Sequence, residues 1–179
     1  PYDIPTANAF IPKNNEDRFV LSAHYADSSL GVFLHSISNS SQWENLLVIL
    51  VADHGAHYPD SIQYHQKEKF HVPILFTGGC ITKDTVIHKI CSQTDISATL
   101  FSALKIPYRF KFSRNILSND YIPFAYYSFN NGMGWVDENC YFVLSHDSKS
   151  NIIDSGICNS SYRFAKSYFQ VLMQDFISK

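Results

Sequence analysis

The stretch that decides the fold is NLLVILVADHGAHYPD, residues 45–60. The seven residues from Leu46 to Ala52 are apolar and mostly branched, and the run stops abruptly at an acid, a histidine and a glycine. A nearly continuous apolar run of this length is typical of a strand buried on both faces of a sheet. We therefore expect a buried strand whose carboxyl end carries Asp53 and His54.

A second apolar run and two helical patterns lie on either side of this strand. Val72 to Phe76 predicts another buried strand, and Ser92-Gln93-Thr94-Asp95 resembles a capping box at the start of a helix. Apolar residues at three- and four-residue spacing predict helices over 17–38 and 92–104. This alternation predicts that the two apolar runs are adjacent parallel strands in one sheet, with the two helices against its faces.

The last third of the chain has a different pattern. Short apolar segments over 124–129, 140–146 and 151–157 are separated by Asn, Gly and Asp, which predicts an antiparallel meander. Between them, YSFNNGMGWV (127–136) reads as a Gly-rich turn that carries Asn130, Asn131 and Trp135; ordinary turn chemistry is the preferred explanation, and a pocket rim is the alternative. A helical stripe follows over 160–178, capped by Asn159-Ser160-Ser161.

Together these patterns predict an α/β fold class: the C-terminal part of a doubly wound, mainly parallel sheet, followed by a small antiparallel meander and a C-terminal helix. We expect residues 1–179 to form one domain portion. Its parts are an extended arm over 1–15, an α/β part over 16–110, antiparallel strands over 120–158 and a helix over 160–178.

Composition excludes several classes of protein. The net charge of -2 and the scattered Lys and Arg residues give no basic surface for nucleic acid. No apolar stretch approaches the length of a membrane span or a signal sequence, and no Gly-rich nucleotide-binding motif occurs. The four cysteines, Cys80, Cys91, Cys140 and Cys158, lack C-x-x-C spacing, so disulfides and reduced core thiols both stay open, as does any pairing.

Asp53 and His54 are candidate metal ligands. In α/β sheets, binding groups gather at the carboxyl ends of strands, where we expect these two side chains. A carboxylate and a neutral imidazole side by side can ligate a divalent cation, and Gly55 allows the backbone to turn sharply after them. Two adjacent ligands do not complete a site, so further ligands must come from elsewhere.

Four motifs in order carry a resemblance to a known family. They are YADSSLGVFLHSI, VILVADHG, FHVPILFTGG and QTDISATLFSALKI, which together span roughly residues 19–106. This order is similar to the C-terminal part of the alkaline phosphatase superfamily catalytic domain, in the sulfatase-like branch that includes lipoteichoic acid synthases. The resemblance implies that Asp53 and His54 bind one divalent cation, with Mn, Mg and Zn all compatible with such ligands.

The resemblance also implies a nucleophilic mechanism at phosphorus or sulfur. A threonine or serine alkoxide, or formylglycine in true sulfatases, attacks the ester and forms a covalent intermediate that is released to water or to an acceptor alcohol. The family places this nucleophile and a further acidic ligand in an N-terminal half, and PYDIP at the start resembles the family sequence just beyond that half. We therefore expect the chain to be a fragment that holds metal weakly and is inactive alone.

Other polar residues have weaker claims to function. His65, Lys67 and His57 follow the metal strand, where related enzymes place a histidine or lysine against the non-bridging oxygens of the substrate. The remaining histidines and one acid are expected to be surface or packing residues: His24, His35, His71, His88, His146 and Asp27. The available hydroxyls match no nucleophile motif: Thr6, Ser22, Thr94 and Thr99.

Three functions stay open at this point. The first is a phosphotransferase that moves a phosphoglycerol-type group from a phospholipid to an acceptor, as an extracytoplasmic domain of a membrane-anchored protein. The second is a sulfatase acting on sulfuric esters, with glycan esters as a further substrate class. The third is a catalytically inert fragment. Under all three functions, we expect the missing N-terminal half of the domain to be a partner of this chain, and we expect no nucleic-acid partner.

Overall fold

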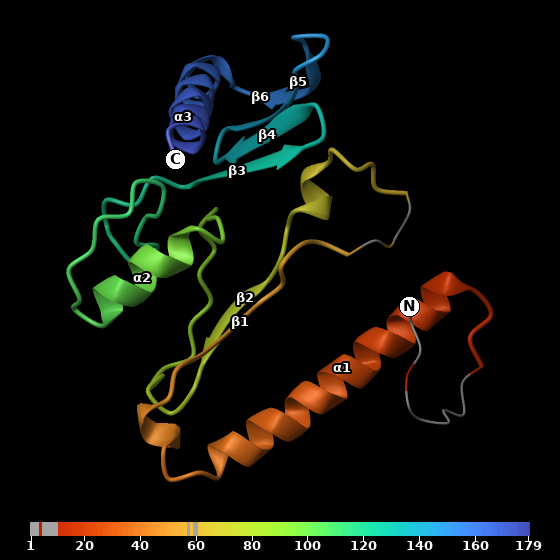
Figure 1. Ribbon diagram of the computed structural model, residues 1–179, viewed down its shortest axis with the longest axis vertical. Helices are drawn as coiled ribbons and strands as arrows, with labels where there is room; N and C mark the ends of the chain where they lie inside the picture. Colours follow the sequence, from red (N-terminus) through yellow and green to blue (C-terminus); the bar gives the residue numbers. More distant parts are fainter. Residues whose placement is uncertain (1–3, 5–10, 57, 59–60) are drawn as a thin grey trace. The chain divides into compact units, whose positions relative to one another are not determined.

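The computed structural model describes residue 4, residues 11–56, residue 58 and residues 61–179. These residues fall into two compact units, one drawn from residues 1–61 and 72–85 and the other from residues 62–71 and 86–179. Figure 1 shows the order of the elements along the chain. Most of the expected extended arm over 1–15, including Thr6, lies outside the described residues.

The first unit begins with a long helix, α1 (Asn15–Ser38), close to the expected bounds. Asn14 caps it by accepting a hydrogen bond from the Asp17 N–H at 2.8 Å. None of the α1 residues is buried, and Val32 is 73% exposed. The expected burial of its apolar stripe against a sheet is therefore not observed in this chain.

The two apolar runs form strands β1 (Val48–Val51) and β2 (Ile74–Thr77), paired in one sheet. A 3-10 turn, η1 (Trp43–Asn45), precedes β1. The pairing is as expected, but the parallel orientation is wrong, because Val48 pairs with Thr77 and Val51 with Ile74 in an antiparallel ladder. The connection between the strands contains no described helix, only a second 3-10 turn, η2 (Lys67–Lys69), so the chain returns without the helical crossover that usually joins parallel neighbours.

Burial on both faces of these strands is also not observed. β1 and β2 contain no buried residue, and Val51 and Leu75 are 42% and 52% exposed. The described sheet has only these two strands, so each has one edge without a strand partner among the described residues. Gly78 ends the second strand at a φ of 132°, where an added Cβ would meet the Leu46 carbonyl oxygen at 2.1 Å.

The second unit contains α2 (Asp95–Ala103), which starts three residues later than the sequence predicts. The expected capping box is partly present, since the Ser92 N–H donates to Asp95 Oδ2 at 3.0 Å, whereas the Thr94 side chain makes no capping hydrogen bond. Asp95 is completely buried and pairs with Arg114. This pair joins the start of α2 to the irregular segment that leads into the next sheet.

That sheet has four antiparallel strands in the order β3-β4-β5-β6, which confirms the predicted meander. The strands are β3 (Phe124–Phe129), β4 (Gly132–Asp137), β5 (Cys140–Ser145) and β6 (Asn151–Gly156). The interpretation of 127–136 as a turn that carries Trp135 is wrong, because β3 and β4 occupy eight of its ten residues and Trp135 is 1% exposed. Only Asn130 and Asn131 form the turn, with Asn131 at a φ of 64°.

The C-terminal helix α3 (Asn159–Ile177) packs against one face of this sheet (Figure 1). The shared core contains sheet residues Phe124, Met133, Trp135 and Phe142 together with Ala165 of the helix. The expected N-cap is wrong by one residue, because Cys158 occupies the cap position and Asn159 is already helical. Cys158 forms a disulfide with Cys140, which joins the start of the helix to β5. Among the described residues no helix is long and apolar enough to cross a membrane.

Candidate functional site

Asp53 and His54 lie immediately after β1, as the sequence predicts, and both side chains are highly exposed. The Asp53 carboxylate accepts a hydrogen bond from the His54 backbone N–H at 2.9 Å. His54 Nε2 lies 3.5 Å from Asp53 Oδ2. One carboxylate oxygen and one ring nitrogen are therefore close neighbours.

The separation of these two atoms fits a shared divalent cation. Two donors that are each about 2.1 Å from a tetrahedral metal ion lie about 3.4 Å apart. The other ring nitrogen, His54 Nδ1, lies 2.9 Å from the Gly55 carbonyl oxygen. A carbonyl oxygen only accepts, so Nδ1 donates to it; in the neutral imidazole, Nε2 is then the nitrogen with the free lone pair that a metal ion requires.

The pair supplies two ligands. In the described part of the chain, no group of three or more His, Cys, Asp or Glu side chains is arranged to hold a metal ion. The ligand roles of Asp53 and His54 therefore rest on their chemistry and on the geometry of the pair, and they stay a prediction.

His65 and Lys67 belong to the second unit, in the segment 62–71. The His65 ring contacts Tyr64 and Phe129 at centroid distances of 5.2 and 6.2 Å. The Lys67 ammonium lies over the Tyr141 ring, 4.7 Å from its centroid. Both side chains are thus held by aromatic residues, and their proposed contact with substrate stays a prediction.

The third predicted substrate residue, His57, lies outside the described residues. His24 and Asp27 are exposed on α1, and His35 at its end lies 3.5 Å from the Asn39 side chain. His71 and His88 are exposed, and the His146 ring stacks on Phe169 at 5.1 Å.

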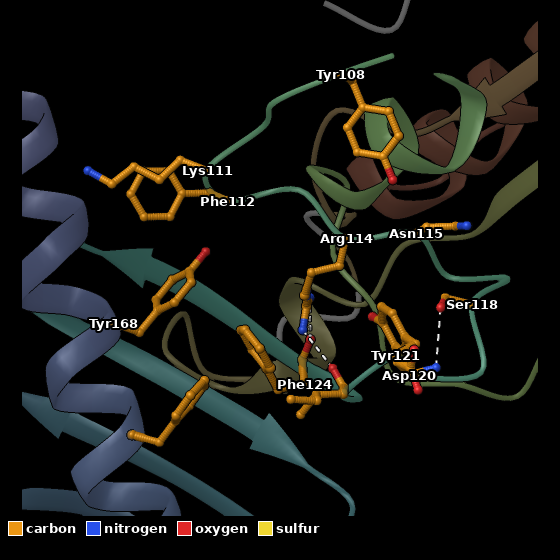
Figure 2. A pocket seen from close by; sticks show the side chains of 12 residues that line it. Tyr108, Lys111, Phe112, Arg114, Asn115, Ser118, Asp120, Tyr121, Phe124 and Tyr168 are labelled. Carbon is orange, nitrogen blue, oxygen red and sulfur yellow. Dashed lines mark hydrogen bonds between the residues drawn. The ribbon is translucent and has the colours of Figure 1, made fainter. Parts of the chain in front are cut away.

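A cavity of about 420 Å³ opens within the second unit, between α3 and the segment that precedes β3 (Figure 2). Its wall is largely aromatic, and it also contains several polar side chains: Tyr108, Lys111, Phe112, Arg114, Asn115, Ser118, Asp120, Tyr121, Ile122, Phe124, Phe164 and Tyr168. The two cations are already engaged, because Lys111 donates to Asp175 at 2.9 Å and Arg114 pairs with Asp95. The cavity therefore offers mainly aromatic faces.

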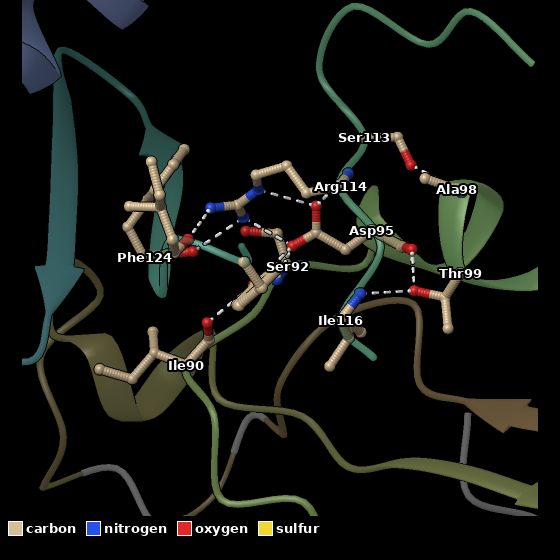
Figure 3. Close-up of polar contacts among 11 residues, drawn as sticks. Ile90, Ser92, Asp95, Ala98, Thr99, Ser113, Arg114, Ile116 and Phe124 are labelled. Carbon is tan, nitrogen blue, oxygen red and sulfur yellow. Dashed lines mark hydrogen bonds and ion pairs between the residues drawn. The ribbon is translucent and has the colours of Figure 1, made fainter. Parts of the chain in front are cut away.

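The polar cluster around Asp95 is a feature that sequence reasoning interpreted only as a helix cap (Figure 3). The Asp95 carboxylate accepts hydrogen bonds from the Arg114 backbone N–H at 2.9 Å and from Arg114 Nε at 3.0 Å. The Tyr121 hydroxyl lies 2.8 Å from the Ile90 carbonyl oxygen and 3.1 Å from Asp95 Oδ2, so these two acceptors share its one proton. Burial raises the pKa of the Tyr121 phenol, which therefore stays a hydrogen-bond donor across the physiological pH range.

Thr99 extends the same cluster. Its hydroxyl donates to the Asp95 carbonyl oxygen at 2.7 Å and accepts from the Ile116 N–H at 3.0 Å. Thr99 is only 5% exposed. These contacts explain the Asp and Thr of the TDISAT sequence as structural residues.

Comparison with known proteins relates most of the chain to one fold. The Sulfatase family model matches residues 5–106, which is more than half of the chain. A crystal structure of a protein in the alkaline phosphatase superfamily from Vibrio parahaemolyticus is similar, with a TM-score of 0.69 and 20% sequence identity. The match covers 90% of this chain and 42% of that chain, so the chain spans about two fifths of that protein's length. No curated protein matches the chain.

Proposed function

The chain belongs to the sulfatase family, and from this premise we propose that it is part of a metal-dependent ester hydrolase or transferase in which Asp53 and His54 hold a divalent cation. The observation that carries the proposal is the exposed carboxylate–imidazole pair after β1, with its donor atoms 3.5 Å apart. Enzymes of this family generally use a divalent metal. Mn, Mg and Zn all accept a carboxylate and an imidazole.

The residues of the pair have distinct roles in this proposal. Asp53 contributes negative charge, and the Gly55 carbonyl holds His54 in the tautomer that presents Nε2. A bound cation would neutralise charge that develops on the ester oxygens and would acidify a neighbouring hydroxyl nucleophile. His65 and Lys67 are proposed to bind the non-bridging oxygens of the phosphate or sulfate group.

The nucleophile is proposed to lie upstream of Pro1. Thr99 is buried with both hydrogen-bonding functions of its hydroxyl in use, and Thr94 occupies the N-cap of α2. Ser22 lies on α1, in a segment without a recognised nucleophile motif. We therefore propose that the covalent step needs a serine, threonine or formylglycine from the N-terminal half of the same domain.

For the substrate we propose a phosphoglycerol-type ester, as in the lipoteichoic-acid-synthase-like branch, with a phospholipid or glycan ester as the reacting molecule. The motifs around Asp53 support this branch, and a sulfatase is the second candidate, which the family match itself favours. We also propose an extracytoplasmic, membrane-anchored parent protein. The Cys140–Cys158 disulfide supports this location, because disulfides persist mainly in oxidising compartments.

The test uses the parent protein that contains this chain, with chromogenic phosphodiester, phosphate monoester and sulfate ester substrates and added Mn, Mg or Zn. We expect metal-dependent turnover of one ester class, reduced at least a hundredfold by His54→Ala and by Asp53→Asn. His88→Ala and Asp84→Asn are matched controls, since both residues are exposed and lie 30 or more positions further along the chain. Full activity in His54→Ala would overturn the proposal.

The same assay tests the inert-fragment alternative. We expect no turnover from the 179-residue chain alone, because the nucleophile is proposed to lie outside it. Metal-dependent turnover by this chain, lost in His54→Ala, would show that a nucleophile is present among its own hydroxyls.

A further inference from the structure

Two tyrosines of the antiparallel sheet hold the segment 62–71 in place. The Tyr127 hydroxyl donates to the His65 carbonyl oxygen at 2.9 Å, and the Tyr141 hydroxyl accepts from the Lys67 N–H at 3.1 Å. The two hydroxyl oxygens lie 3.3 Å apart. A continuous series of hydrogen bonds therefore runs from the Lys67 backbone through both phenols to the His65 backbone.

These tyrosines point away from α3. Successive side chains of a strand alternate between faces, so Tyr127 and Phe129 of β3 lie on the face opposite Phe124 and Tyr126. Phe124 belongs to the core shared with the helix, whereas the Tyr127 ring stacks on Phe70 at 4.1 Å. Segment 62–71 therefore packs on the face of the sheet that α3 does not cover.

The two glycines of β4 make room for this arrangement. Gly134 is the cross-strand partner of Tyr127, and Gly132 is the partner of Phe129. An added Cβ on Gly134 would lie 1.9 Å from the Tyr127 ring, and one on Gly132 would lie 2.2 Å from the Phe129 ring. The rings lie over the glycines, which explains the GMG sequence as a packing feature of a strand.

Tyr141 contacts Lys67 twice. Its hydroxyl binds the Lys67 backbone, and its ring lies under the Lys67 ammonium at 4.7 Å. Lys67 is the cation that the proposed function assigns to the non-bridging oxygens of the substrate. We infer that Tyr127 and Tyr141 are positioning residues that fix the substrate-binding segment 62–71, and that Tyr141 sets the place of the Lys67 ammonium.

This inference rests on the proposed function for its catalytic consequence, but the docking of the segment has a test of its own. The Lys67 amide should exchange slowly with deuterium in the intact protein and at least about fivefold faster in Tyr141→Phe, which lacks the accepting oxygen. Tyr126→Phe is the matched control. Its hydroxyl comes from β3 of the same sheet but from the opposite face, and it has no well-formed hydrogen bond among the described residues. Equal exchange in all three proteins would overturn the docking.

The catalytic consequence is tested by steady-state kinetics of the parent protein. Tyr141→Phe should raise KM for the anionic ester about fivefold and leave kcat within about twofold, because it loosens a binding cation and removes no reacting group. Lys67→Ala should raise KM further. In the Lys67→Ala background, Tyr141→Phe should add nothing, since its effect acts through Lys67.

The outcomes separate the two proposals. If His54→Ala abolishes turnover but Tyr141→Phe and Lys67→Ala raise KM by factors that multiply in the double variant, the positioning role is overturned and the proposed function stands. If His54→Ala is fully active, the proposed function fails, while amide exchange still decides whether the tyrosines hold the segment. A KM unchanged by Tyr141→Phe in an enzyme that depends on His54 overturns the positioning role.

Discussion

Replacement of Asp95 should strongly destabilise the second unit. Asp95 is completely buried, and its carboxylate accepts four hydrogen bonds, from the Ser92 N–H and from the Arg114 backbone N–H, Nε and Nη2, and shares the Tyr121 hydroxyl proton with the Ile90 carbonyl oxygen. Asp95→Ala would leave the Arg114 guanidinium without its counter-charge and two backbone N–H groups without an acceptor. Asp95→Asn keeps the shape but turns an amide N–H₂ toward these donors.

The expected loss follows from burial. Removal of one partner from a buried ion pair typically costs about 3 to 5 kcal/mol, because it leaves an uncompensated buried charge. The Arg114 side chain is 22% exposed and keeps hydrogen bonds to the Ile122 and Phe124 carbonyl oxygens. Water and these carbonyls can compensate part of the loss, so we expect about 3 kcal/mol for Asp95→Ala and less for Asp95→Asn.

Urea unfolding followed by tryptophan fluorescence measures this change. Trp135 is buried in the core of the same unit, and a Trp43→Phe background removes the signal of the other tryptophan. Asp175→Asn is the matched control, because Asp175 pairs with Lys111 at the surface and should shift the midpoint little. A double-mutant cycle of Asp95→Ala with Arg114→Ala isolates the interaction between the two residues.

A small effect would refute this reasoning. If Asp95→Asn and Asp175→Asn lowered the free energy of unfolding by similar small amounts, the buried pair would be absent in solution. Additive single substitutions in the cycle would lead to the same conclusion. If Asp95→Ala fails to fold, Asp95→Asn supplies the measurement.

Three further predictions concern the same unit and the thiols. Removal of the Cys140–Cys158 disulfide by a double Cys→Ala substitution should lower the free energy of unfolding by about 3 kcal/mol, as measured in urea, because the bond closes a loop of 18 residues. Partial burial raises the pKa of the Asp137 carboxyl, but the surrounding hydroxyl, indole and backbone N–H donors outweigh it and hold that pKa below its ordinary value of 3.8. Asp137→Asn should therefore lower the urea midpoint at pH 7, and the difference should shrink as the pH falls below about 4. Burial, reinforced by the nearby Asp95 charge, raises the pKa of the Cys91 thiol, so at pH 7.5 a maleimide should modify exposed Cys80 faster than Cys91.

The structural features that the sequence predicted correctly depend on residues that are close together along the chain. The strands of the meander alternate apolar residues between turn residues, and three of them were found within one residue of their bounds. β4 was missed because Gly132 and Gly134 have low strand propensity and contribute no side chain to a pattern. Their role becomes visible only when Tyr127 and Phe129 lie across them.

Features that depend on distant residues were not predictable in the same way. An apolar run shows that a strand is present but not its direction, so the pairing of β1 with β2 was predicted and its antiparallel orientation was not. Asp95 was interpreted as a cap because its partner, Arg114, lies 19 residues further along, in a segment without regular structure. No periodicity relates two such positions.

The two groups of candidate residues differ in the same respect, and this difference has a functional consequence. The backbone N–H of His54 donates to the Asp53 carboxylate, and the His54 ring bonds the Gly55 carbonyl, so three consecutive residues share these contacts. Segment 62–71 instead depends on Tyr127 and Tyr141, which follow it by more than fifty residues. Perturbation of the four-stranded sheet should therefore loosen segment 62–71. Under the proposed function, this change should weaken substrate binding, because Lys67 belongs to that segment.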